Sequence, residues 1–520
     1  MPVRKVSVLS EKQSNRAMRA TLTVTLVIIV SKLCGFVRDM VLANYFGTTV
    51  ASDAYNSAYS LFYLPILLFN SCITSTLVPQ YMRVRDERNL HQANRFASNV
   101  LNVFSLFALV VSALMYLLAG PLVNLIYSGF GPEKAALTTE LTRVMMPSLI
   151  FFVASIVLTS ILNATEHYNA AQLTGFPLSL ALILAMVLFA DRCGIHAVAW
   201  GVFVAGVLQV VVLLPALRKC FHYRPVLNVR DARLRRLLVL AVPAVLSMAV
   251  NELNHMVDRW LASGLTDGTL AAMSYAFRLI TFVTGILIVP ITTVMFSRMS
   301  RFVAQHNAKA LRSSVSESLQ VIAIVVLPIT VIACVMSTDV IRFAYGRGAF
   351  GEESVAMTAS IFVFYMIGVL FFGARDFLNR AFHALSDTKT PMRFACVSMV
   401  LNVTLNLLLK PVMGANGLAL ATSISAAVGA TLLLVSLKKR MKRLPMREMA
   451  TEMIKILIAS AVCGVVCLGM RYGLPGTLGT LHVFLRLCAA TIVSALAYVG
   501  VLMALRVRQV NTVLQILKRR

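Results

Sequence analysis

The sequence has little charge and little tryptophan, and both shortages exclude classes of protein. Only 13% of its 520 residues are charged and 58% are hydrophobic, whereas soluble domains carry about 25% charged residues. The mean hydropathy is +0.80. This composition excludes a water-soluble enzyme. With two tryptophans in the whole chain, the sequence also gives no sign of an aromatic cage or a sugar-stacking platform.

Acidic residues are scarce as well. The 21 Asp and Glu stand against 48 Lys and Arg, which gives a formal net charge of +27. In a soluble protein this excess would indicate nucleic acid as a partner, but no nucleic-acid-binding motif accompanies it. Basic residues collect in the cytoplasmic loops of membrane proteins. We therefore expect no nucleic acid among the partners.

The sequence lacks a disulfide framework and enzyme signatures. Its nine cysteines form no CxxC pair and are scattered through apolar segments, which predicts small buried side chains. The sequence contains no HExxH, Walker loop or GxSxG motif. We expect a protein that is not an enzyme, has no organic cofactor, and is driven by ion gradients, membrane potential or consumption of its substrate on the far side.

Apolar runs of about 20 residues recur along the chain. A helix of that length crosses a hydrocarbon core of about 30 Å, and in lipid a helix satisfies its own backbone polar groups. The runs predict an all-α polytopic membrane protein with about 14 transmembrane helices. The predicted spans are 20–46, 53–81, 96–127, 136–164, 168–190, 195–217, 236–264, 269–297, 313–337, 354–385, 391–410, 415–437, 450–471 and 481–505.

Basic loops alternate with charge-poor loops between these spans. Lys and Arg collect after the second, sixth, eighth and twelfth spans and in both tails, and 338–353 is the one intervening loop that departs from the pattern. The positive-inside rule then places both termini in the cytoplasm. The predicted organisation is a cytoplasmic tail (1–19), an N-lobe of six spans (20–217), a basic cytoplasmic linker (218–235), a C-lobe of six spans (236–437), a basic cytoplasmic loop (438–449), two further spans (450–505) and a cytoplasmic tail (506–520).

An internal repeat is visible at a shift of 220 residues. Gly194-Ile-His-Ala-Val-Ala-Trp-Gly matches Gly414-Ala-Asn-Gly-Leu-Ala-Leu-Ala, and each stretch opens the sixth span of its lobe after an aliphatic fifth span. Odd-numbered spans of both lobes start on the same side, so the two six-helix repeats are parallel. Transporters with such repeats bind substrate between the halves and rock them about that site.

Ionisable residues inside the spans are few. Each costs about 2.5–3.5 kcal/mol on insertion scales, so each is expected to face a cavity or a partner. The first span carries Lys32, Arg38 and Asp39, and the tenth carries Arg375 beside Asp376. The two adjacent pairs of opposite charge also fit structural ion pairs.

Arg278 in the eighth span has no counter-ion nearby in the sequence. Nineteen uncharged residues separate it from Arg298. A guanidinium that lines a cavity can hold phosphate or carboxylate through its planar fork. Together with Lys32 and Arg38 of the other half, it predicts a basic anion site across the repeat interface.

Oxygen-bearing side chains form a second candidate site. Its members are Asn251, Asn254 and Asp258 of the seventh span, Asn402 and Asn406 of the eleventh, and Thr422 of the twelfth. The first set falls at i, i+3 and i+7 and the second at i and i+4, so each set shares a helix face. One carboxylate with amide and hydroxyl oxygens suits a hard monovalent or divalent cation. The same spacing fits an interhelical hydrogen-bond network equally well.

Several stretches together carry a resemblance to a known family. They are Ser31–Asp39 (SKLCGFVRD), Ser52–Tyr55 (SDAY), Tyr345–Phe350 (YGRGAF) and Asn379–Pro391 (NRAFHALSDTKTP). This ordered set, over about 20–440, resembles the MurJ/MviN family of lipid II flippases in the multidrug/oligosaccharidyl-lipid/polysaccharide exporter superfamily. The resemblance implies two lobes around a cavity that alternates between inward- and outward-facing states.

The resemblance also implies a function and site residues. A bacterial inner-membrane protein of this family moves lipid II, an undecaprenyl-diphosphate-linked disaccharide peptide, to the outer leaflet for peptidoglycan biosynthesis. The family's cavity arginines carry over to Arg38 and Arg278, its more N-terminal basic position to Lys32, and its second-helix acid to Asp53. Membrane lipids and cell-wall synthesis proteins are the implied partners.

A sodium site described in some members maps onto the oxygen-rich residues. The corresponding positions are Asp258, Asn402, Asn406 and Thr422, with a backbone carbonyl near Leu418. The resemblance therefore favours ion binding at these residues, with sodium as the expected ion.

Two alternatives stay open at this point. Many members carry an Arg followed by Glu-Gly in the second helix, whereas this chain has Asn70 about where the Glu stands. A flippase for another polyprenyl-linked oligosaccharide is therefore the alternative within the class. A polytopic transferase acting on the same lipid is the alternative from another class, and it requires an acid/base or metal site at a membrane face. A multidrug antiporter is disfavoured because its cavity should carry acidic residues for cationic drugs, whereas the candidate cavity residues here are basic.

Overall fold

The computed structural model describes residues 26–441, 444–473 and 479–510. The side chains left out of this part are those of Pro243, Ala244, Ser247, Val250, Asn251 and Thr480. The predicted tail 1–19 lies outside the described residues, as do 442–443 of the basic loop and 511–520 of the C-terminal tail. Within the described part every regular element is a helix, as the sequence predicts. The chain divides into two compact units, Met1–Leu253 and Asn254–Arg520.

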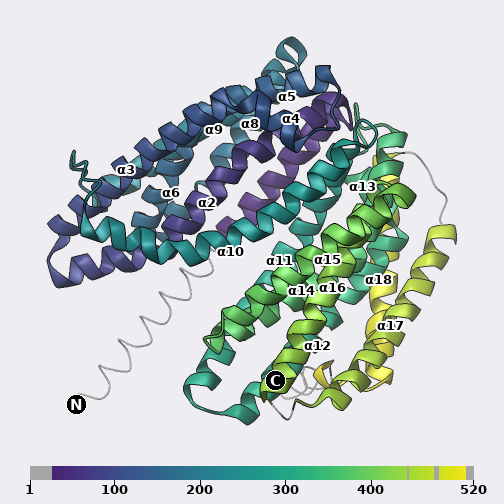
Figure 1. Ribbon diagram of the computed structural model, residues 1–520. Coiled ribbons are helices and arrows are strands. Elements are labelled where there is room, and N and C mark those ends of the chain that lie inside the picture. Colours follow the sequence, from purple (N-terminus) through teal and green to yellow (C-terminus); the bar gives the residue numbers. More distant parts are fainter. Residues whose placement is uncertain (1–25, 442–443, 474–478, 511–520) are drawn as a thin grey trace, which may run out of the picture. The chain divides into compact units, whose positions relative to one another are not determined.

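The N-terminal unit begins with a helix over 26–46. It continues with α2 (Val50–Glu87), α3 (Leu90–Leu117), α4 (Ala119–Ile126), α5 (Pro132–Met145), the 3-10 turn η1 (Met146–Ser148), α6 (Leu149–Ala164), α7 (Tyr168–Gln172), α8 (Gly175–Cys193), α9 (His196–Cys220) and most of α10 (Ala232–Ser263). α2 packs against α5 and α6, and α8 pairs with α9 (Figure 1). Phe62 of α2 and Phe152 of α6 meet edge to face at 5.4 Å in the core of this unit.

The C-terminal unit starts within α10. Its helices are α11 (Thr269–Ala304), α12 (Ala308–Val335), α13 (Ser337–Tyr345), α14 (Glu352–Ala384), α15 (Lys389–Met413), α16 (Ala415–Met441), α17 (Met446–Gly473) and α18 (Thr480–Ala504). α14 packs against α11, α12 and α16, and α15 pairs with α16 (Figure 1). α14 is therefore the central helix of the unit.

Twelve helices in the described part are long and apolar enough to cross a membrane. Each coincides with a predicted span, so the protein is a polytopic membrane protein. The other two predicted spans, 20–46 and 236–264, contain positions that the structure does not fully describe. The total of about fourteen spans stays a prediction.

Two predicted spans are interrupted at prolines. The predicted helix 96–127 stops at Leu117 and resumes as α4, whose first turn contains Pro121. The predicted helix 136–164 is divided by η1, which contains Pro147. Proline has no N–H to donate to the preceding turn and disfavours helical geometry in the residue before it. Hydrophobicity alone does not reveal these breaks.

The repeat is visible in the backbone of the turns. Gly194 ends α8 and Gly414 ends α15, both with a φ of 56°. Glycine adopts such a positive φ without steric strain. Glu166 and Ser386, another pair 220 residues apart, have φ values of 64° and 58° in the turns that follow α6 and α14. The equal turn geometry agrees with the predicted duplication.

The predicted linker 218–235 contains an extended segment that runs along α3. Asn99 Nδ2 donates to the Asn228 carbonyl at 2.9 Å, and Asn99 Oδ1 accepts from the Asn228 N–H at 2.6 Å. Asn102 Nδ2 donates to the Val226 carbonyl at 2.8 Å. These side-chain amides take the place of the backbone partners that an extended segment has in a sheet. The linker is thus attached to the N-terminal unit.

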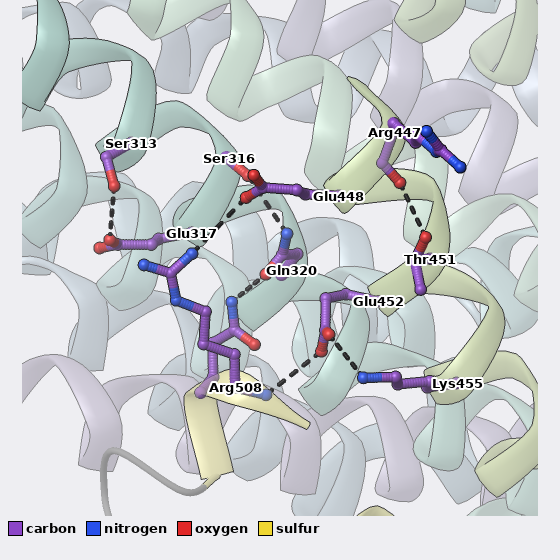
Figure 2. A network of polar contacts seen from close by, with 11 residues as sticks. Ser313, Ser316, Glu317, Gln320, Arg447, Glu448, Thr451, Glu452, Lys455 and Arg508 are labelled. Atoms are coloured by element: carbon purple, nitrogen blue, oxygen red, sulfur yellow. Dashed lines mark hydrogen bonds and ion pairs between the residues drawn. The ribbon is translucent and has the colours of Figure 1, made fainter. Parts of the chain in front are cut away.

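The last two spans dock onto α12. Gln320 of α12 is hydrogen-bonded to Gln509, beyond the end of α18. Glu452 of α17 accepts from the Arg508 N–H at 3.2 Å, and Figure 2 shows this contact. The Tyr498 hydroxyl of α18 donates to a carbonyl of α12 at 2.9 Å. α17 and α18 are therefore joined to the C-terminal unit by polar contacts as well as by apolar packing.

The cysteines are all free. Cys72, Cys463 and Cys467 are buried, as expected for small apolar side chains, but Cys193 and Cys396 are exposed. The expectation of burial is wrong for these two. Side chains that face lipid are as apolar as those inside the protein, so hydrophobicity does not separate the two positions.

Candidate functional site

The helix over 26–46 carries the first predicted anion-binding side chains. Arg38 Nη2 donates to Asp39 Oδ1 at 2.8 Å, and Arg38 Nε donates to the same oxygen at 3.1 Å. The two side chains are 18% and 8% exposed. Asp39 therefore neutralises Arg38 and orients it, while engaging only one side of a guanidinium that has donors in three directions.

Lys32 stands apart from this pair. It is half-buried, six positions before Arg38. At 3.6 residues per turn the two basic side chains point about 120° apart around the helix axis. The described residues supply neither a hydrogen bond nor an ion pair for the Lys32 ammonium, and no contact joins it to Arg38.

Asp53, the predicted acid of the second helix, lies in a buried ion pair. Lys134 Nζ of α5 donates to Asp53 Oδ2 of α2 at 2.5 Å, and the two side chains are 7% and 1% exposed. The same ammonium lies 4.4 Å from the centre of the Phe130 ring. Sequence reasoning missed Lys134, whose only signal is a lone lysine in a charge-poor loop. Asp53 is thus bound to α5 in this structure.

Arg278 and Arg375, the predicted basic residues of the C-terminal unit, are both half-buried beside aromatic rings. The Arg278 Cζ lies 5.8 Å from the Tyr275 ring of its own helix, α11, and the Arg375 Cζ lies 5.8 Å from the Phe372 ring of α14. Asp376, the neighbour of Arg375, pairs with Arg380 at 3.2 Å. Arg38 therefore pairs with the acid next to it in the sequence, as expected. The ion pair of Asp376 is instead with Arg380, four residues later.

The oxygen-rich residues of the C-terminal unit lie together. Asn406 Nδ2 of α15 donates to Asp258 Oδ1 of α10 at 2.6 Å and to Asn402 Oδ1 at 2.9 Å. Asn402 Nδ2 donates to the Thr422 hydroxyl of α16 at 3.4 Å. That hydroxyl donates in turn to the Leu418 carbonyl at 3.0 Å. Three helices thus contribute to one small polar cluster.

Neither orientation of the Asn402 amide satisfies all its neighbours. One terminal atom of this amide lies 3.0 Å from Asp258 Oδ1, 3.1 Å from Asn254 Oδ1 and 2.9 Å from Asn406 Nδ2. If that atom is nitrogen, it faces the Asn406 N–H; if it is oxygen, three oxygens converge. Within the described part, Asn406 Oδ1 is also buried with no hydrogen-bond partner.

An orphaned buried carbonyl oxygen is an acceptor that a bound cation satisfies. The donor set has one carboxylate, with amide, hydroxyl and carbonyl oxygens, so it fits a hard cation of low charge. Asn254 lies beside this cluster, as its position on the predicted face of the seventh span implies. The side chain of Asn251, the other asparagine on that face, lies outside the described residues.

Comparison with known proteins assigns the chain to a family. The model of the family described as "Lipid II flippase MurJ" matches residues 42–489. A curated relative from Rhizobium tropici, described as a probable lipid II flippase MurJ, is 29% identical over 464 residues, which is 86% of each chain.

Solved structures agree with this match. A structure described as lipid II flippase MurJ in an inward closed conformation superposes with a TM-score of 0.79 at 25% identity, covering 93% of this chain and 100% of that one. An inward-facing multidrug resistance MATE transporter of the MOP superfamily reaches a TM-score of 0.69 at 13% identity, over 81% of this chain and 98% of the other. The latter is a likeness of fold alone. The chain belongs to the lipid II flippase MurJ family.

Proposed function

We propose that this protein moves lipid II from the cytoplasmic to the outer leaflet of the bacterial plasma membrane by alternating access. The observation that carries this proposal is the family match over 42–489, which extends through both repeated units. A transporter fold with a charged residue pair inside its first span suits an amphiphile with a diphosphate. The same membership makes the protein a transporter and disfavours the transferase alternative.

Arg38 is the side chain of the N-terminal unit best suited to the diphosphate. Asp39 takes the Nε–Nη2 side of its guanidinium, so the donors on Nη1 remain directed away from the carboxylate and suit a phosphate oxygen. Lys32, on the same helix, adds a second cation as a point charge. In the C-terminal unit we assign the same chemistry to Arg278, with Arg375 as a further basic candidate.

The transport test uses purified protein in proteoliposomes that contain lipid II. We expect Arg38→Ala and Arg278→Ala to abolish flipping while the protein stays folded, and the corresponding Lys variants to rescue poorly because an ammonium lacks the planar fork. Arg192→Ala, at the exposed end of α8, is the matched control. Full activity of the Arg38→Ala variant would remove Arg38 from the mechanism.

We also propose that the cluster around Asp258 holds a sodium ion. Asp258, Asn402, Asn406 and Thr422 would hold it, with the Leu418 carbonyl, and the ion supplies positive charge to the buried carboxylate. The buried Asn406 Oδ1, which has no hydrogen-bond partner in the described part, supports this assignment. A hydrogen-bond network without an ion is the competing interpretation.

Thermal stability separates the two interpretations. A ligand that binds the folded state and not the unfolded state raises the melting temperature, by an amount that grows with the ligand concentration relative to its Kd. We expect sodium, compared with equal potassium, to raise the melting temperature of the wild type, and Asp258→Asn to remove that increase. Equal melting curves of the wild type in sodium and potassium would leave the cluster as an interhelical network.

Orientation, partners and cargo are further proposals. The basic loops favour cytoplasmic termini in the inner membrane, and cell-wall synthesis proteins are the expected partners of a peptidoglycan precursor flippase.

The alternative cargo is another polyprenyl-linked oligosaccharide. Proteoliposomes that contain undecaprenyl diphosphate with a different saccharide test this, because transport of that lipid in place of lipid II would favour the alternative.

A further inference from the structure

Three tyrosines form a ladder along α2. Tyr55, Tyr59 and Tyr63 are spaced at i, i+4 and i+8, which places them on one stripe of the helix. The Tyr55 and Tyr59 ring centres lie 5.9 Å apart at an interplanar angle of 33°, and those of Tyr59 and Tyr63 lie 5.7 Å apart at 12°. The last two rings are therefore nearly parallel and stacked.

Exposure increases along the ladder. Tyr55 is 2% exposed, Tyr59 is half-buried, and Tyr63 is 40% exposed. Tyr55 thus belongs to the core of the N-terminal unit, as an aromatic stripe on a helix usually does. Tyr63 presents much of its ring and hydroxyl outside the packed core.

Two charged side chains lie near the exposed end of the ladder. Tyr63 lies close enough to Arg38 and to Glu252, which is in the part of α10 that belongs to the N-terminal unit, to interact electrostatically with both. Arg38 interacts in the same way with Tyr59 and Tyr55. Three elements of this unit, the helix over 26–46, α2 and α10, therefore place an acid, a base and stacked aromatic rings in one neighbourhood.

These surroundings indicate which environment Tyr63 faces. Tyr63 lies in the uncharged stretch of α2 between Asp53 and Arg83, and the charged side chains near it come from the helix over 26–46 and from α10. Ionisable groups such as Arg38 and Glu252 inside a membrane line water-filled cavities or face partners. The exposed face of Tyr63 therefore belongs to a polar cavity.

We propose that Tyr59, Tyr63 and Glu252 form a saccharide subsite beside Arg38. The apolar C–H face of a pyranose ring packs on an aromatic ring, and a carboxylate accepts hydrogen bonds from sugar hydroxyls. In a saccharide-diphosphate the first sugar is bonded directly to the phosphate, so a diphosphate at Arg38 places that sugar next to the tyrosines. The tyrosines thus supply the stacking surface that the low tryptophan content argued against. This inference rests on the proposed function.

The test compares two lipids that differ only in the saccharide. Lipid II and undecaprenyl diphosphate share the tail and the diphosphate, and binding of each to the purified full-length protein is measured by titration in detergent. We expect Tyr63→Leu to weaken lipid II binding about tenfold, on the scale of one lost aromatic contact, and to leave undecaprenyl diphosphate binding unchanged. Tyr63→Phe retains the ring and should retain most of the affinity.

Further variants complete the comparison. Glu252→Gln should also weaken lipid II selectively, because it removes a charged acceptor for the sugar hydroxyls. Arg38→Ala should weaken both lipids, because both carry the diphosphate. Tyr116→Leu, at a tyrosine of α3 that is 44% exposed, should change neither.

The outcomes distinguish the subsite from the function on which it rests. Equal loss of both lipids in Tyr63→Leu, or no loss of either, overturns the saccharide subsite while leaving the flippase intact. Binding of neither lipid by the wild type overturns the proposed function and the subsite with it. Selective loss of lipid II in Tyr63→Leu and Glu252→Gln supports the subsite.

Discussion

Three charged side chains inside the predicted spans are held by partners of different kinds. Arg38 is neutralised by its sequence neighbour Asp39 at 2.8 Å, Asp53 by Lys134 at 2.5 Å, and Asp258 accepts from an asparagine amide at 2.6 Å. A charge without such a partner would pay the full cost of leaving water. Of these three arrangements, that of Asp258 has a neutral amide as its hydrogen-bond partner, which is why we propose a cation there and not at Asp53.

The buried pair of Asp53 and Lys134 leads to a prediction about stability. Removing one partner of a buried ion pair costs about 3–5 kcal/mol, whereas replacing both is often neutral. We expect Asp53→Asn and Lys134→Met each to lower the melting temperature of the detergent-purified protein, and the double variant to recover most of the loss. A single variant as stable as the wild type would contradict the pair. Flipping by the stabilised double variant then shows whether Asp53 also contacts substrate.

Asp387, in the turn between α14 and α15, leads to a prediction about pH. The Thr390 N–H donates to it at 3.0 Å and the Thr390 hydroxyl at 2.8 Å, and Arg440 pairs with it. These contacts, with the backbone hydrogen bond first, lower the pKa of Asp387 below its ordinary value of 3.8. A lowered pKa in the folded state contributes stability above pH 3.8, and this contribution is lost as the pH falls through the folded value.

The measurement is melting temperature against pH. Asp387→Asn should melt below the wild type at neutral pH, and the gap should close in acid as the wild-type carboxyl is protonated. Asp191→Asn, at an exposed position in the last turn of α8, is the control and should follow the wild type throughout. A constant gap at all pH values would show that the charge of Asp387 is not responsible.

The candidate site was predictable where it follows helix periodicity. The faces of Asp258, Asn402 and Asn406 follow from spacings within single helices, and these side chains do lie together in the structure. Lys134 was not predictable, because its partner is 81 positions away in the sequence and only packing brings α5 to α2. The i, i+4 spacing of the tyrosine ladder is visible in the sequence, but an aromatic stripe on a helix usually indicates packing in the hydrophobic core.

Among the helices, the length of each apolar run predicts where a helix lies, but it predicts neither the breaks within a run nor the structure of the segments between runs. The spans coincide with apolar helices because about 20 apolar residues satisfy one membrane crossing. The breaks at Pro121 and Pro147 depend on single residues that barely change the hydropathy. The extended conformation of the linker could not be predicted for another reason: its hydrogen-bond partners are side chains of α3 that lie more than 120 positions away in the sequence.

The linker contacts predict a local opening that can be measured. Asn99→Ala removes both hydrogen bonds to Asn228, each with a net contribution of about 0.5–1.5 kcal/mol. We expect faster amide hydrogen exchange over 224–230, with the exchange of α3 unchanged. Asn124→Ala, at an exposed position of α4, is the control. Unchanged exchange in the Asn99 variant would mean that other contacts hold the linker.

At the scale of the whole molecule, the duplication and the charge distribution together set the topology. Turns with equal φ at Gly194 and Gly414 end corresponding helices of the two units. The predicted six spans per repeat would return the chain to the side where it started, so that both repeats would begin on one side of the membrane. The positive-inside rule predicts that this side, with its basic loops, is cytoplasmic.

Cysteine accessibility tests this topology. In a background without the nine native cysteines, single cysteines at the exposed positions His91, Arg230 and Lys439 should react with an impermeant maleimide only after the cells are permeabilised. Cysteines at Glu133 and Asp191, exposed in the described structure and predicted to face the other side, should react in intact cells. Each position reports on a different number of preceding crossings. Labelling of both Arg230 and Lys439 but not of His91 in intact cells would therefore place a single error between the third and the sixth spans, whereas labelling of Lys439 alone would place it between the seventh and the twelfth.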